Sequence, residues 1–350
     1  MICFAWGGFP QYAARLVGAF VKSTDERVCV VGKPPAVAVE GMEKCTGCEI
    51  HWVQPNDTVH FVEMFGEMPD VLFVSGWHYP VFNRLRDEAI AAGVPVYCLN
   101  DANYVKLSDC SVVRLADWAE FGRQLVRAVV FRLKYRKLFD GFLVPGKSGR
   151  RLLRFYGVPD EKIAEGVYSA DASLFDPDKV DAAKKEKRIV YVGQYIDRKN
   201  VLAVCEAFEK SGIAADGWSL EMYGSGPLKA QIPYAQPFVQ PEQLPEIYRR
   251  ARAFVLASKE EHWGLVVHEA TLSGCYLMLS NRVGAADDLL GEKNGVKFNP
   301  FRVREMIAAF RHLAEMDEEA WEEACRASVE MGKRRGLGNF VEGVERLKLL

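Results

Sequence analysis

The chain contains no hydrophobic run that approaches the roughly 20 residues a helix needs to cross a bilayer. Its first residues, MICFAWGGFPQYAARL, have no basic segment ahead of the apolar ones and are interrupted by glycine and proline, so we do not expect a signal peptide. The formal net charge is only −2, which gives no reason to expect nucleic acid as a partner. No internal repeat or low-complexity segment is present. These absences favour a globular protein of the cytoplasm.

The nine cysteines form an odd number, and most of them stand inside apolar, strand-like runs. This placement favours buried free thiols in a reducing compartment. Cys45 and Cys48 are the exception, because they form a CxxC pattern with His51 and His60 nearby. Structural zinc sites usually have four ligands in tight spacing, so we expect a surface loop with two incidental thiols, with zinc binding as the alternative.

Short apolar runs alternate with amphipathic stretches of helical length, which is typical of βαβ units and parallel sheets. A length of 350 residues suits about two domains. The expected strands are residues 2–6, 28–32, 71–76, 94–100, 142–146, 188–193, 219–224, 253–258, 276–281 and 296–298. Each is almost continuously apolar, as expected for strands covered on both faces.

The alternation breaks once, in a polar and highly charged stretch that contains Pro177. The sequence therefore predicts an α/β protein with two doubly wound, Rossmann-like domains. We expect a first domain over 1–172, a linker over 173–187, a second domain over 188–325 and a C-terminal helical tail over 326–350 that packs back on the first domain. Ligands of such sheets bind at the carboxyl ends of the strands, so we expect the functional residues in the loops that follow strands.

Two loops of the second half have the composition of phosphate sites. Arg198 and Lys199 stand just before a predicted helix, where a cation and the helix N-terminus act together on an anion. Gly224 and Gly226, in the sequence GSGP, let the backbone approach a ligand closely. The alternative interpretations are a solvated charged turn for the first loop and a simple turn for the second.

The stretch EEHWGLVVHEATLSG, residues 260–274, has glutamates eight positions apart at Glu261 and Glu269. We expect a helix to start near Trp263 and Gly264, so that the N–H groups of His262 to Leu265 form an anion site between the two acids. A diphosphate flanked by two hydroxyl-bearing rings matches this pattern, which is that of a nucleotide-sugar. The alternative is a core helix with a chance pair of acids.

The loops of the first half are less specific. Gly7 and Gly8 follow the first strand and open a helix, where a glycine pair can admit a phosphate or an acceptor. His78 follows the third predicted strand and is a candidate base or polar contact. Asp101 and Asn103 follow the next strand and are candidates for an acceptor pocket. Structural turns are the alternative for each of them.

Residues 123–154 are strongly basic, and apolar residues are interleaved with the charged ones. The basic members include Arg127, Arg132, Lys134, Arg136, Lys137, Lys147, Arg150, Arg151 and Arg154. One interpretation is a pair of amphipathic helices with solvated faces. The other is contact with an anionic membrane surface or with a lipid-diphosphate acceptor.

Six stretches between about residues 188 and 300 resemble, in order, the retaining nucleotide-sugar glycosyltransferases of family 4. They are VGQYIDRKN, YGSGPL, LPEIYRRARAFVLASKEEHWGLVVHEA, SGCYLMLSN, VGAADDLL and KNGVKF. The pattern E-x-W-G-L-V-x-x-E-A, together with the upstream lysine and GSGP, is rarely met by chance. The first half resembles the family only loosely, through GGFP, GVPDEKI and the stretch from Asp171 to Phe175. The resemblance implies the GT-B fold, in which two Rossmann-like domains face a cleft, the first on the acceptor side and the second binding the nucleotide-sugar.

The resemblance also implies roles for single residues. Lys199 would bind the donor diphosphate and stabilise it as the leaving group, and Glu261 would contact the hydroxyls of the donor sugar. Glu269 would hold the ribose. Gly224 and Gly226 would line the diphosphate.

Gln194 occupies the position of an arginine in the family. This departure removes one phosphate charge, for which Arg198 is the candidate substitute. Contacts to the base are expected mainly from backbone near Val239 and Gln240.

The implied reaction is transfer of a sugar with retention from a UDP- or GDP-sugar to a glycan or lipid-linked acceptor. No cofactor and no metal ion are expected to be required, because positive charge from the chain would stabilise the diphosphate. Such an enzyme would act in the synthesis of surface polysaccharide, lipopolysaccharide or glycolipid, in the cytoplasm or on the inner face of the membrane. The alternative is a weakly active or inactive partner protein that binds nucleotide-sugars, with Gln194 as the mark of lost turnover.

Overall fold

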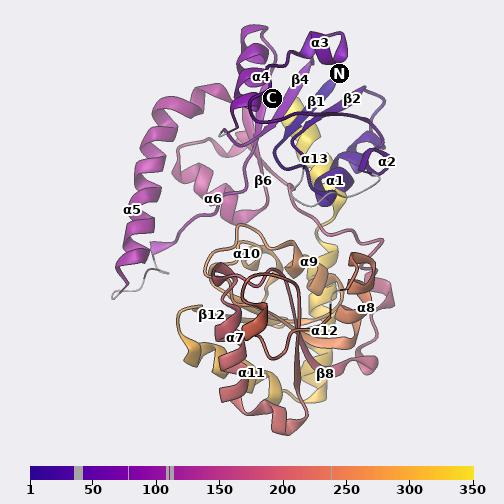
Figure 1. Ribbon diagram of the computed structural model, residues 1–350, viewed down its shortest axis with the longest axis vertical. Coiled ribbons are helices and arrows are strands. Elements are labelled where there is room, and N and C mark those ends of the chain that lie inside the picture. The colour runs from indigo at the N-terminus through magenta and orange to yellow at the C-terminus, as the bar shows by residue number, and fades with distance from the viewer. Residues whose placement is uncertain (35–41, 78, 108–109, 111–113, 238) are drawn as a thin grey trace. The chain divides into compact units, whose positions relative to one another are not determined.

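The computed structural model describes residues 1–350 except 35–41, 78, 108–109, 111–113 and 238. The chain divides into two compact units (Figure 1). The first contains Met1–Ser169 together with Leu337–Leu350, and the second contains Ala170–Gly336. The segment 173–187, expected as a linker, falls inside the second unit.

The first unit is built on a seven-stranded parallel sheet in the order β3-β2-β1-β4-β5-β6-β7. Its strands are β1 (Ile2–Trp6), β2 (Val28–Gly32), β3 (Glu49–Trp52), β4 (Val71–Ser75), β5 (Val96–Leu99), β6 (Gly141–Val144) and β7 (Ile163–Glu165). Its helices are α1 (Gln11–Val21), α2 (Met42–Thr46), α3 (Phe61–Phe65), α4 (Pro80–Ala91), α5 (Leu115–Val130), the π-helical turn η2 (Phe131–Tyr135), α6 (Lys147–Phe155) and α13 (Leu337–Lys348).

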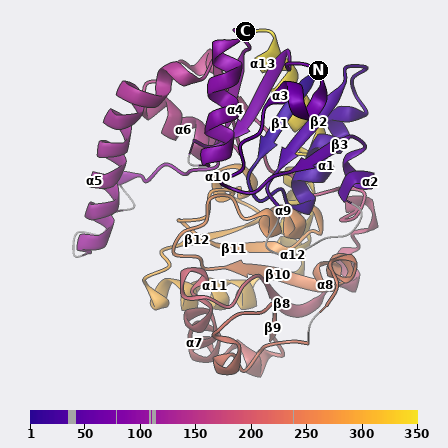
Figure 2. The same cartoon turned by 45° about the horizontal axis from the view of Figure 1, so that its top comes forward.

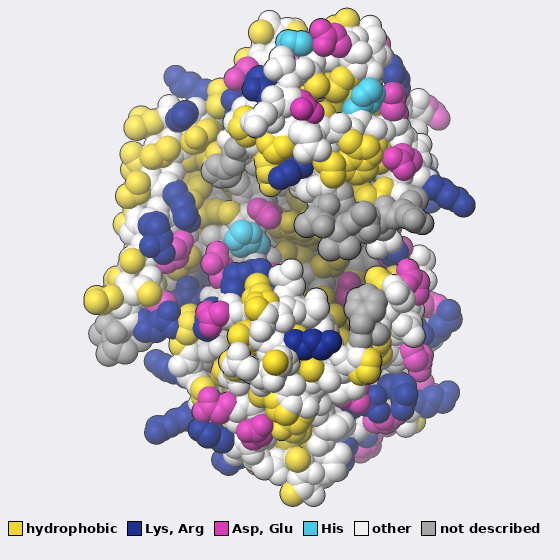
Figure 3. All heavy atoms as spheres, viewed as in Figure 1, with side chains coloured by type: hydrophobic (Ala, Val, Ile, Leu, Met, Phe, Trp, Pro, Cys, Tyr) yellow, Lys and Arg dark blue, Asp and Glu magenta, His cyan; other side chains and the backbone are white. Residues whose placement is uncertain are grey.

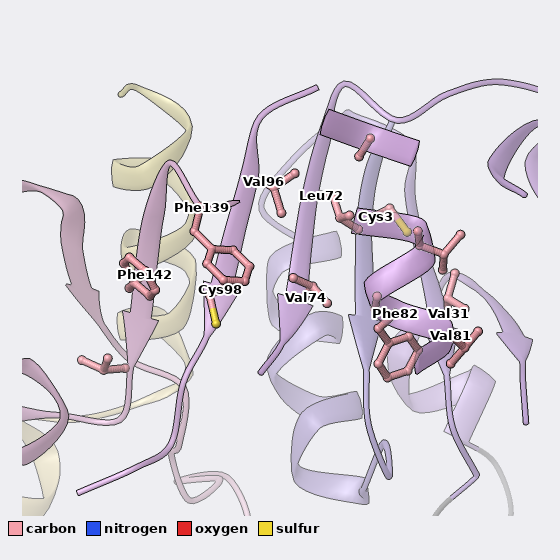
Figure 4. Packing of buried hydrophobic residues seen from close by; sticks show 14 of the residues in the cluster. Cys3, Val31, Leu72, Val74, Val81, Phe82, Val96, Cys98, Phe139 and Phe142 are labelled. Carbon is pink, nitrogen blue, oxygen red and sulfur yellow. The ribbon is translucent and has the colours of Figure 1, made fainter. Parts of the chain in front are cut away.

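Two hydrophobic layers cover the faces of this sheet. On one face, side chains from alternate strand positions pack against α3, α4, η2 and α6, and Figure 4 shows Cys3, Val31 and Leu72 of the strands together with Phe82 of α4. The other face packs against α1 and α13. The strands β1, β2, β5 and β6 therefore bury both of their faces, which explains why their sequences are apolar without alternation.

The second unit is built on a five-stranded parallel sheet in the order β12-β11-β10-β8-β9. Its strands are β8 (Glu186–Val192), β9 (Ser219–Tyr223), β10 (Ala251–Leu256), β11 (Tyr276–Ser280) and β12 (Gly295–Phe298). Its helices are α7 (Val201–Ser211), α8 (Leu244–Arg250), α9 (Leu265–Leu272), α10 (Ala286–Leu289), α11 (Val303–Glu315) and α12 (Glu318–Lys333). Helix α7 packs on α11, and α9 packs on α8, α10 and α12.

The predicted fold class is confirmed, since both units are parallel α/β structures. The C-terminal helix α13, yellow in Figures 1 and 2, lies beside the strands and α1 of the first unit, as expected. The preceding helix α12 belongs to the second unit, so the expected tail over 326–350 is split between the two. No helix in the described part of the chain is long and apolar enough to span a membrane.

Helix α9 starts at Leu265, close to the expected position, and Gly264 before it has a left-handed φ of 90°. Two sequence expectations were wrong in detail. Strands β3 and β7 were missed, because β3 is half-exposed and β7 has only three residues. Cys45 lies in the short helix α2 and not in a loop, and both thiols are half-buried. Burial raises the pKa of the Cys48 thiol to about 12.

Candidate active site

The predicted charged residues of the second unit lie at the point where its strand order reverses. From β8 the chain goes first to β9 on one side and then to β10 on the other, so the carboxyl ends of β8 and β10 are neighbours. Lys199 follows β8 and Glu261 follows β10. Open α/β sheets bind their ligands at such a switch point.

An ion pair joins these two loops. The Nζ atom of Lys199 donates to Oε2 of Glu261, and each side chain is only 12% exposed. The hydroxyl of Ser258 donates to the same oxygen at 3.2 Å. The guanidinium of Arg198 lies 3.8 Å from it. Two cations therefore flank one carboxylate, and together the three side chains carry a net positive charge.

Further contacts fix the spacing of the loops. The N–H of Lys259 donates to the carbonyl oxygen of Arg198 at 2.8 Å, and Arg198 Nη1 donates to the carbonyl oxygen of Glu260 at 2.7 Å. The ammonium of Lys259 lies 2.6 Å from Asp197 Oδ1. Hydrogen bonds between the loop after β8 and the loop after β10 therefore fix the backbone of Arg198 and Lys199.

Asn200 explains how the chain passes from Lys199 into α7. It has a left-handed φ of 58°, a conformation that asparagine tolerates better than most residues. Its side-chain amide donates to the carbonyl oxygen of Pro300 at 2.7 Å and is buried. This fixed turn sets the position of Lys199 relative to the start of the helix.

The start of α9 is held by the loop after β11. The N–H of Glu261 donates to the carbonyl oxygen of Arg282 at 3.1 Å, and the N–H of Gly284 donates to the carbonyl oxygen of Glu261 at 3.0 Å. The N–H of Ala285 donates to the carbonyl of Trp263 at 3.0 Å. The Trp263 ring is buried under the guanidinium of Arg335, which lies 5.0 Å from the ring centre. Hydrogen bonds between the loops after β10 and β11 thus fix the position of the first turn of α9.

The second glutamate of the motif has a partner that the sequence did not suggest. The hydroxyl of Tyr248, on α8, donates to Glu269 Oε2 at 3.2 Å. Burial, followed by the charge of Glu269, raises the pKa of Tyr248 well above its ordinary value, so this hydroxyl stays a donor. Glu269 is half-buried, and its carboxylate is oriented by a fully buried side chain.

Gly224 and Gly226 lie so close to the loop after β8 that neither position has room for a side chain. A Cβ on Gly224 would lie 1.8 Å from the carbonyl oxygen of Gly193, and one on Gly226 would lie 2.6 Å from that of Tyr195. The N–H of Tyr195 donates to the carbonyl of Ser225 at 2.7 Å. These glycines therefore let the loops after β8 and β9 pack together.

The remaining predicted donor residues are more exposed. Gln194 is exposed, and its carbonyl oxygen accepts from the Tyr191 hydroxyl at 2.9 Å. His262 is also exposed, with Nε2 at 3.4 Å from Glu260 Oε1. Val239 is half-buried.

In the first unit, the predicted glycines lie at the switch point between β1 and β4. The N–H of Gly7 donates to Ser75 Oγ at 2.7 Å, and a Cβ on Gly7 would meet the ring of Tyr79 at 2.5 Å. Gly8 has a left-handed φ of 61°. His78 lies outside the described residues.

Asp101 belongs to a tyrosine cluster at the same edge of the first sheet. The hydroxyl of Tyr168 donates to Asp101 Oδ2 at 3.1 Å, and the rings of Tyr12 and Tyr168 have their centres 5.0 Å apart. Burial raises the pKa of Tyr12 to about 12. Asn103 is half-buried.

Sequence reasoning missed Tyr248, Ser258, Tyr12 and Tyr168. Ser258 was visible only as the last residue of a predicted strand, and Tyr248 only as an aromatic residue in a basic helix. Within the described residues, no three His, Cys, Asp or Glu side chains gather as metal ligands would.

The second unit matches a known domain. Residues 174–328 match the family model described as "Glycosyl transferases group 1". Among curated proteins, none matches the chain in sequence.

Several solved structures are similar over the whole chain. A glycosyltransferase from Rickettsia africae ESF-5 is 12% identical with a TM-score of 0.72, over 99% of this chain and 97% of that one. HepE from Anabaena, solved with UDP and glucose, is 12% identical with a TM-score of 0.71, over 100% and 99%. Sucrose-phosphate synthase from Thermosynechococcus elongatus is 14% identical with a TM-score of 0.68, over 99% and 98%. The chain therefore has the GT-B fold, and residues 174–328 of its second unit are similar to the glycosyl transferases group 1 family.

Proposed function

We propose that the chain is a retaining glycosyltransferase that moves a sugar from a nucleotide-diphosphate sugar, UDP- or GDP-linked, to a saccharide or lipid-linked acceptor. The observation that carries the proposal is the Lys199–Glu261 pair with Arg198 at the switch point of the second sheet. The family match over 174–328 supports it. HepE, a similar structure, was solved with UDP and glucose, which favours a nucleotide-sugar donor for this chain as well.

In this proposal the diphosphate is bound by the first turn of α9 and by the two cations. The N–H groups of Leu265 and Val266, in the first turn of α9, have no partner further back within the helix, and the helix dipole favours an anion at this end. Lys199 and Arg198 add positive charge. As the bond to the sugar breaks, negative charge grows on the diphosphate, and fixed positive charge stabilises that state more than the ground state.

The two glutamates act on either side of the diphosphate. Glu269 accepts hydrogen bonds from ribose hydroxyls, because its carboxylate is half-buried and oriented by Tyr248. Glu261 accepts from hydroxyls of the donor sugar while its other contacts hold Lys199. The base is bound mainly by backbone near Val239.

On the acceptor side, we propose that the edge of the first sheet with Gly7, Gly8 and Asp101 binds the acceptor hydroxyls. The Tyr168–Asp101 hydrogen bond supports this assignment, because it orients a carboxylate at a strand end. The reaction requires no metal ion in this proposal, since cations of the chain neutralise the diphosphate. Adding a chelator is then expected to leave turnover unchanged.

The test is donor consumption by the purified chain with a panel of UDP- and GDP-sugars. We expect one donor to be turned over, and Lys199→Ala to lower kcat by roughly 100-fold or more, the scale of losing one transition-state contact. Lys210→Ala is the matched control, since Lys210 forms an exposed pair with Glu206 within α7. Equal rates for the two variants would contradict the assignment.

A second candidate function is a partner protein that binds nucleotide-sugars without turnover. The observation that favours it is the exposed Gln194 at the position where the family has arginine. The two functions are separated by Gln194→Arg. If only the phosphate charge limits the protein, the variant binds UDP or GDP about tenfold more tightly and turns over faster. Tighter binding with no donor consumption would favour the partner protein.

A further inference from the structure

Helix α5 of the first unit has its polar and apolar faces inverted relative to a helix that packs on a core. The residues that it buries include Asp117 and Gln124, whereas most of its large apolar side chains are exposed. A helix of a globular protein normally directs its apolar stripe inward. The exposed apolar side of α5 therefore indicates contact with an apolar partner outside this unit.

Specific hydrogen bonds hold α5 and η2 in this orientation. The side-chain amide of Gln124 accepts from the N–H of Val105 at 2.7 Å and donates to the Val105 carbonyl at 3.1 Å. Arg132 donates to the carbonyl oxygens of Tyr156 at 3.1 Å and Phe155 at 2.8 Å. Phe131 is buried in the core below. A rotation that buried the apolar side would break all of these contacts.

The outward side forms one continuous apolar surface, which we call the α5 stripe. Its members lie on one side of the helix, most of them three, four or seven residues apart, and include Leu115, Trp118, Leu125, Val126, Val129 and Leu133. Leu115 is 85% exposed, Val126 63% and Leu133 79%. In Figure 3, hydrophobic side chains gather along the left edge of the first unit, where Figure 1 places α5.

Basic residues border the stripe. Residues 114–137 contain seven Lys or Arg against two Asp or Glu, a net charge of +5 in a chain whose total is −2. Arg123 and Arg127 lie beside Glu120 on the flank, and Lys134, Arg136 and Lys137 follow in the exposed turn after the helix. Of the basic region predicted over 123–154, only the part on α5 and in the turn after it borders the apolar surface. On α6, Arg150 is paired with Glu165 and Asp160, and Leu152 and Leu153 are buried, so that helix does not extend the surface.

We propose that the α5 stripe docks on the surface of an anionic phospholipid bilayer. Apolar side chains at the centre would enter the boundary between headgroups and acyl chains, while the bordering cations would meet lipid phosphates. A second copy of the chain fits less well, because a two-fold contact would place +5 against +5. The inference goes beyond the transferase proposal and does not depend on it, since docking needs no donor or acceptor.

The test is co-sedimentation of the full chain with vesicles of phosphatidylcholine alone or with 30% phosphatidylglycerol. We expect binding to the anionic vesicles that weakens with added salt. The double variant Val126→Ser/Leu133→Ser is expected to lower the vesicle affinity by at least tenfold. The matched control is Val62→Ser/Ile90→Ser, which removes two exposed apolar side chains outside α5 and is expected to bind like the wild type.

A charge variant tests the second element of the proposal. Lys134→Gln/Arg136→Gln leaves the stripe intact and is expected to weaken binding about fivefold per charge. Circular dichroism of each variant establishes that it is folded. Brominated lipid is expected to quench wild-type emission more than that of Trp118→Phe, because Trp118 lies on the stripe.

Three results would overturn the proposal. The wild type could fail to sediment with anionic vesicles at low salt. The Val126→Ser/Leu133→Ser variant could sediment like the wild type. Light scattering could show a dimer that this variant converts to a monomer, in which case the stripe is a contact between two copies.

Discussion

At the scale of single residues, the carboxylate of Glu261 organises the candidate site. It joins Lys199, Ser258 and Arg198, which come from two loops after two neighbouring strands. A mostly buried carboxylate with one partner would be costly, and two hydrogen-bond donors together with a guanidinium at 3.8 Å offset the loss of hydration. The same contacts keep the lysine in place, so charge and position are set together.

A second residue of the motif, His268, has a structural role. Its imidazole is fully buried, with Nδ1 accepting from the N–H of Ala170 at 2.9 Å and Nε2 3.0 Å from the carbonyl oxygen of Gly332. The carbonyl can only accept, so the proton stands on Nε2 and the ring is neutral. One side chain of α9 therefore ties the first residue of the second unit to the end of α12.

Stability is expected to depend on pH through His268. Burial lowers the pKa of this imidazole from 6.5 to about 4, and the nearby positive charge of Arg335 acts in the same direction. As the pH falls below 6.5, the unfolded chain takes up the proton first, so stability is complete above that pH and is lost progressively toward pH 4. The loss is about 3 kcal/mol. Urea unfolding of wild type and His268→Gln between pH 7 and 4 measures it.

The variant is expected to lose less stability than the wild type over this range, whatever its stability at pH 7. His312→Gln is the control, because His312 is exposed on α11 and should leave the slope unchanged. Identical slopes for wild type and His268→Gln would show that the histidine is not buried in its neutral form.

At the scale of elements, the loops after β8 and β9 form one packed unit. Gly193 N–H donates to the Tyr223 carbonyl at 3.0 Å, and Leu228 N–H donates to the Tyr195 carbonyl at 3.1 Å. Gly224 lies between them, with a φ of 158° and no space for a Cβ. A loop that is proposed to bind phosphate is thus fixed by its neighbour before any ligand binds.

Gly224→Ala is therefore expected to lower the free energy of unfolding by about 3 kcal/mol or more, because a methyl group would overlap the Gly193 carbonyl. Gly212→Ala is the matched control. That glycine also has a positive φ, of 79°, but nothing lies within 4 Å of its added Cβ. The control should cost only about 1 kcal/mol. Urea unfolding of both variants makes the comparison, and equal losses would show that the loops are not in contact.

The elements also show which parts of the structure the sequence can predict. Strands such as Ile2–Trp6 and Tyr276–Ser280 were recognisable because burial on both faces leaves a continuous apolar run. Strand Glu49–Trp52 was not, because its side chains are partly exposed and their pattern resembles that of a loop. The inverted orientation of α5 was equally hidden, since a hydrophobic pattern gives the period of a helix and not the side that faces the core.

For the site, the sequence pointed to Lys199, Glu261 and Glu269 through their place after predicted strands. It could not place Tyr248 beside Glu269, because that contact joins two helices 21 positions apart. It also could not show that Gly224, expected beside a ligand, packs closely against the Gly193 carbonyl. Contacts between distant segments depend on packing that local pattern does not encode.

At the scale of the whole molecule, the first unit is completed by the end of the chain. Phe340 of α13 is fully buried, with ring centres 5.8 Å from Phe4 and 6.3 Å from Trp6. A Cβ on Gly166 would lie 2.4 Å from the carbonyl oxygen of Asn339, so the helix packs tightly on the sheet edge. The chain thus leaves the first unit after Ser169 and returns at Leu337.

Phe340→Ala is expected to destabilise the first unit by about 3–5 kcal/mol, although the change lies near the C-terminus. Hydrogen exchange should become faster in β1 and β2 and stay unchanged in β8 and β10. Phe310→Ala is the matched control. Phe310 is buried on α11 against Phe208, so its loss should have the opposite pattern. Faster exchange in both sheets for either variant would contradict the division into two units.

The central claim is that the second unit binds a nucleoside diphosphate between Lys199 and the first turn of α9. The most direct measurement is a crystal structure of the chain with UDP or GDP, whichever raises the melting temperature more. The account predicts the diphosphate within hydrogen-bond distance of Lys199 Nζ and the N–H groups of Gly264 and Leu265, with the ribose hydroxyls on Glu269. Nucleotide bound away from the carboxyl ends of β8 and β10 would contradict it.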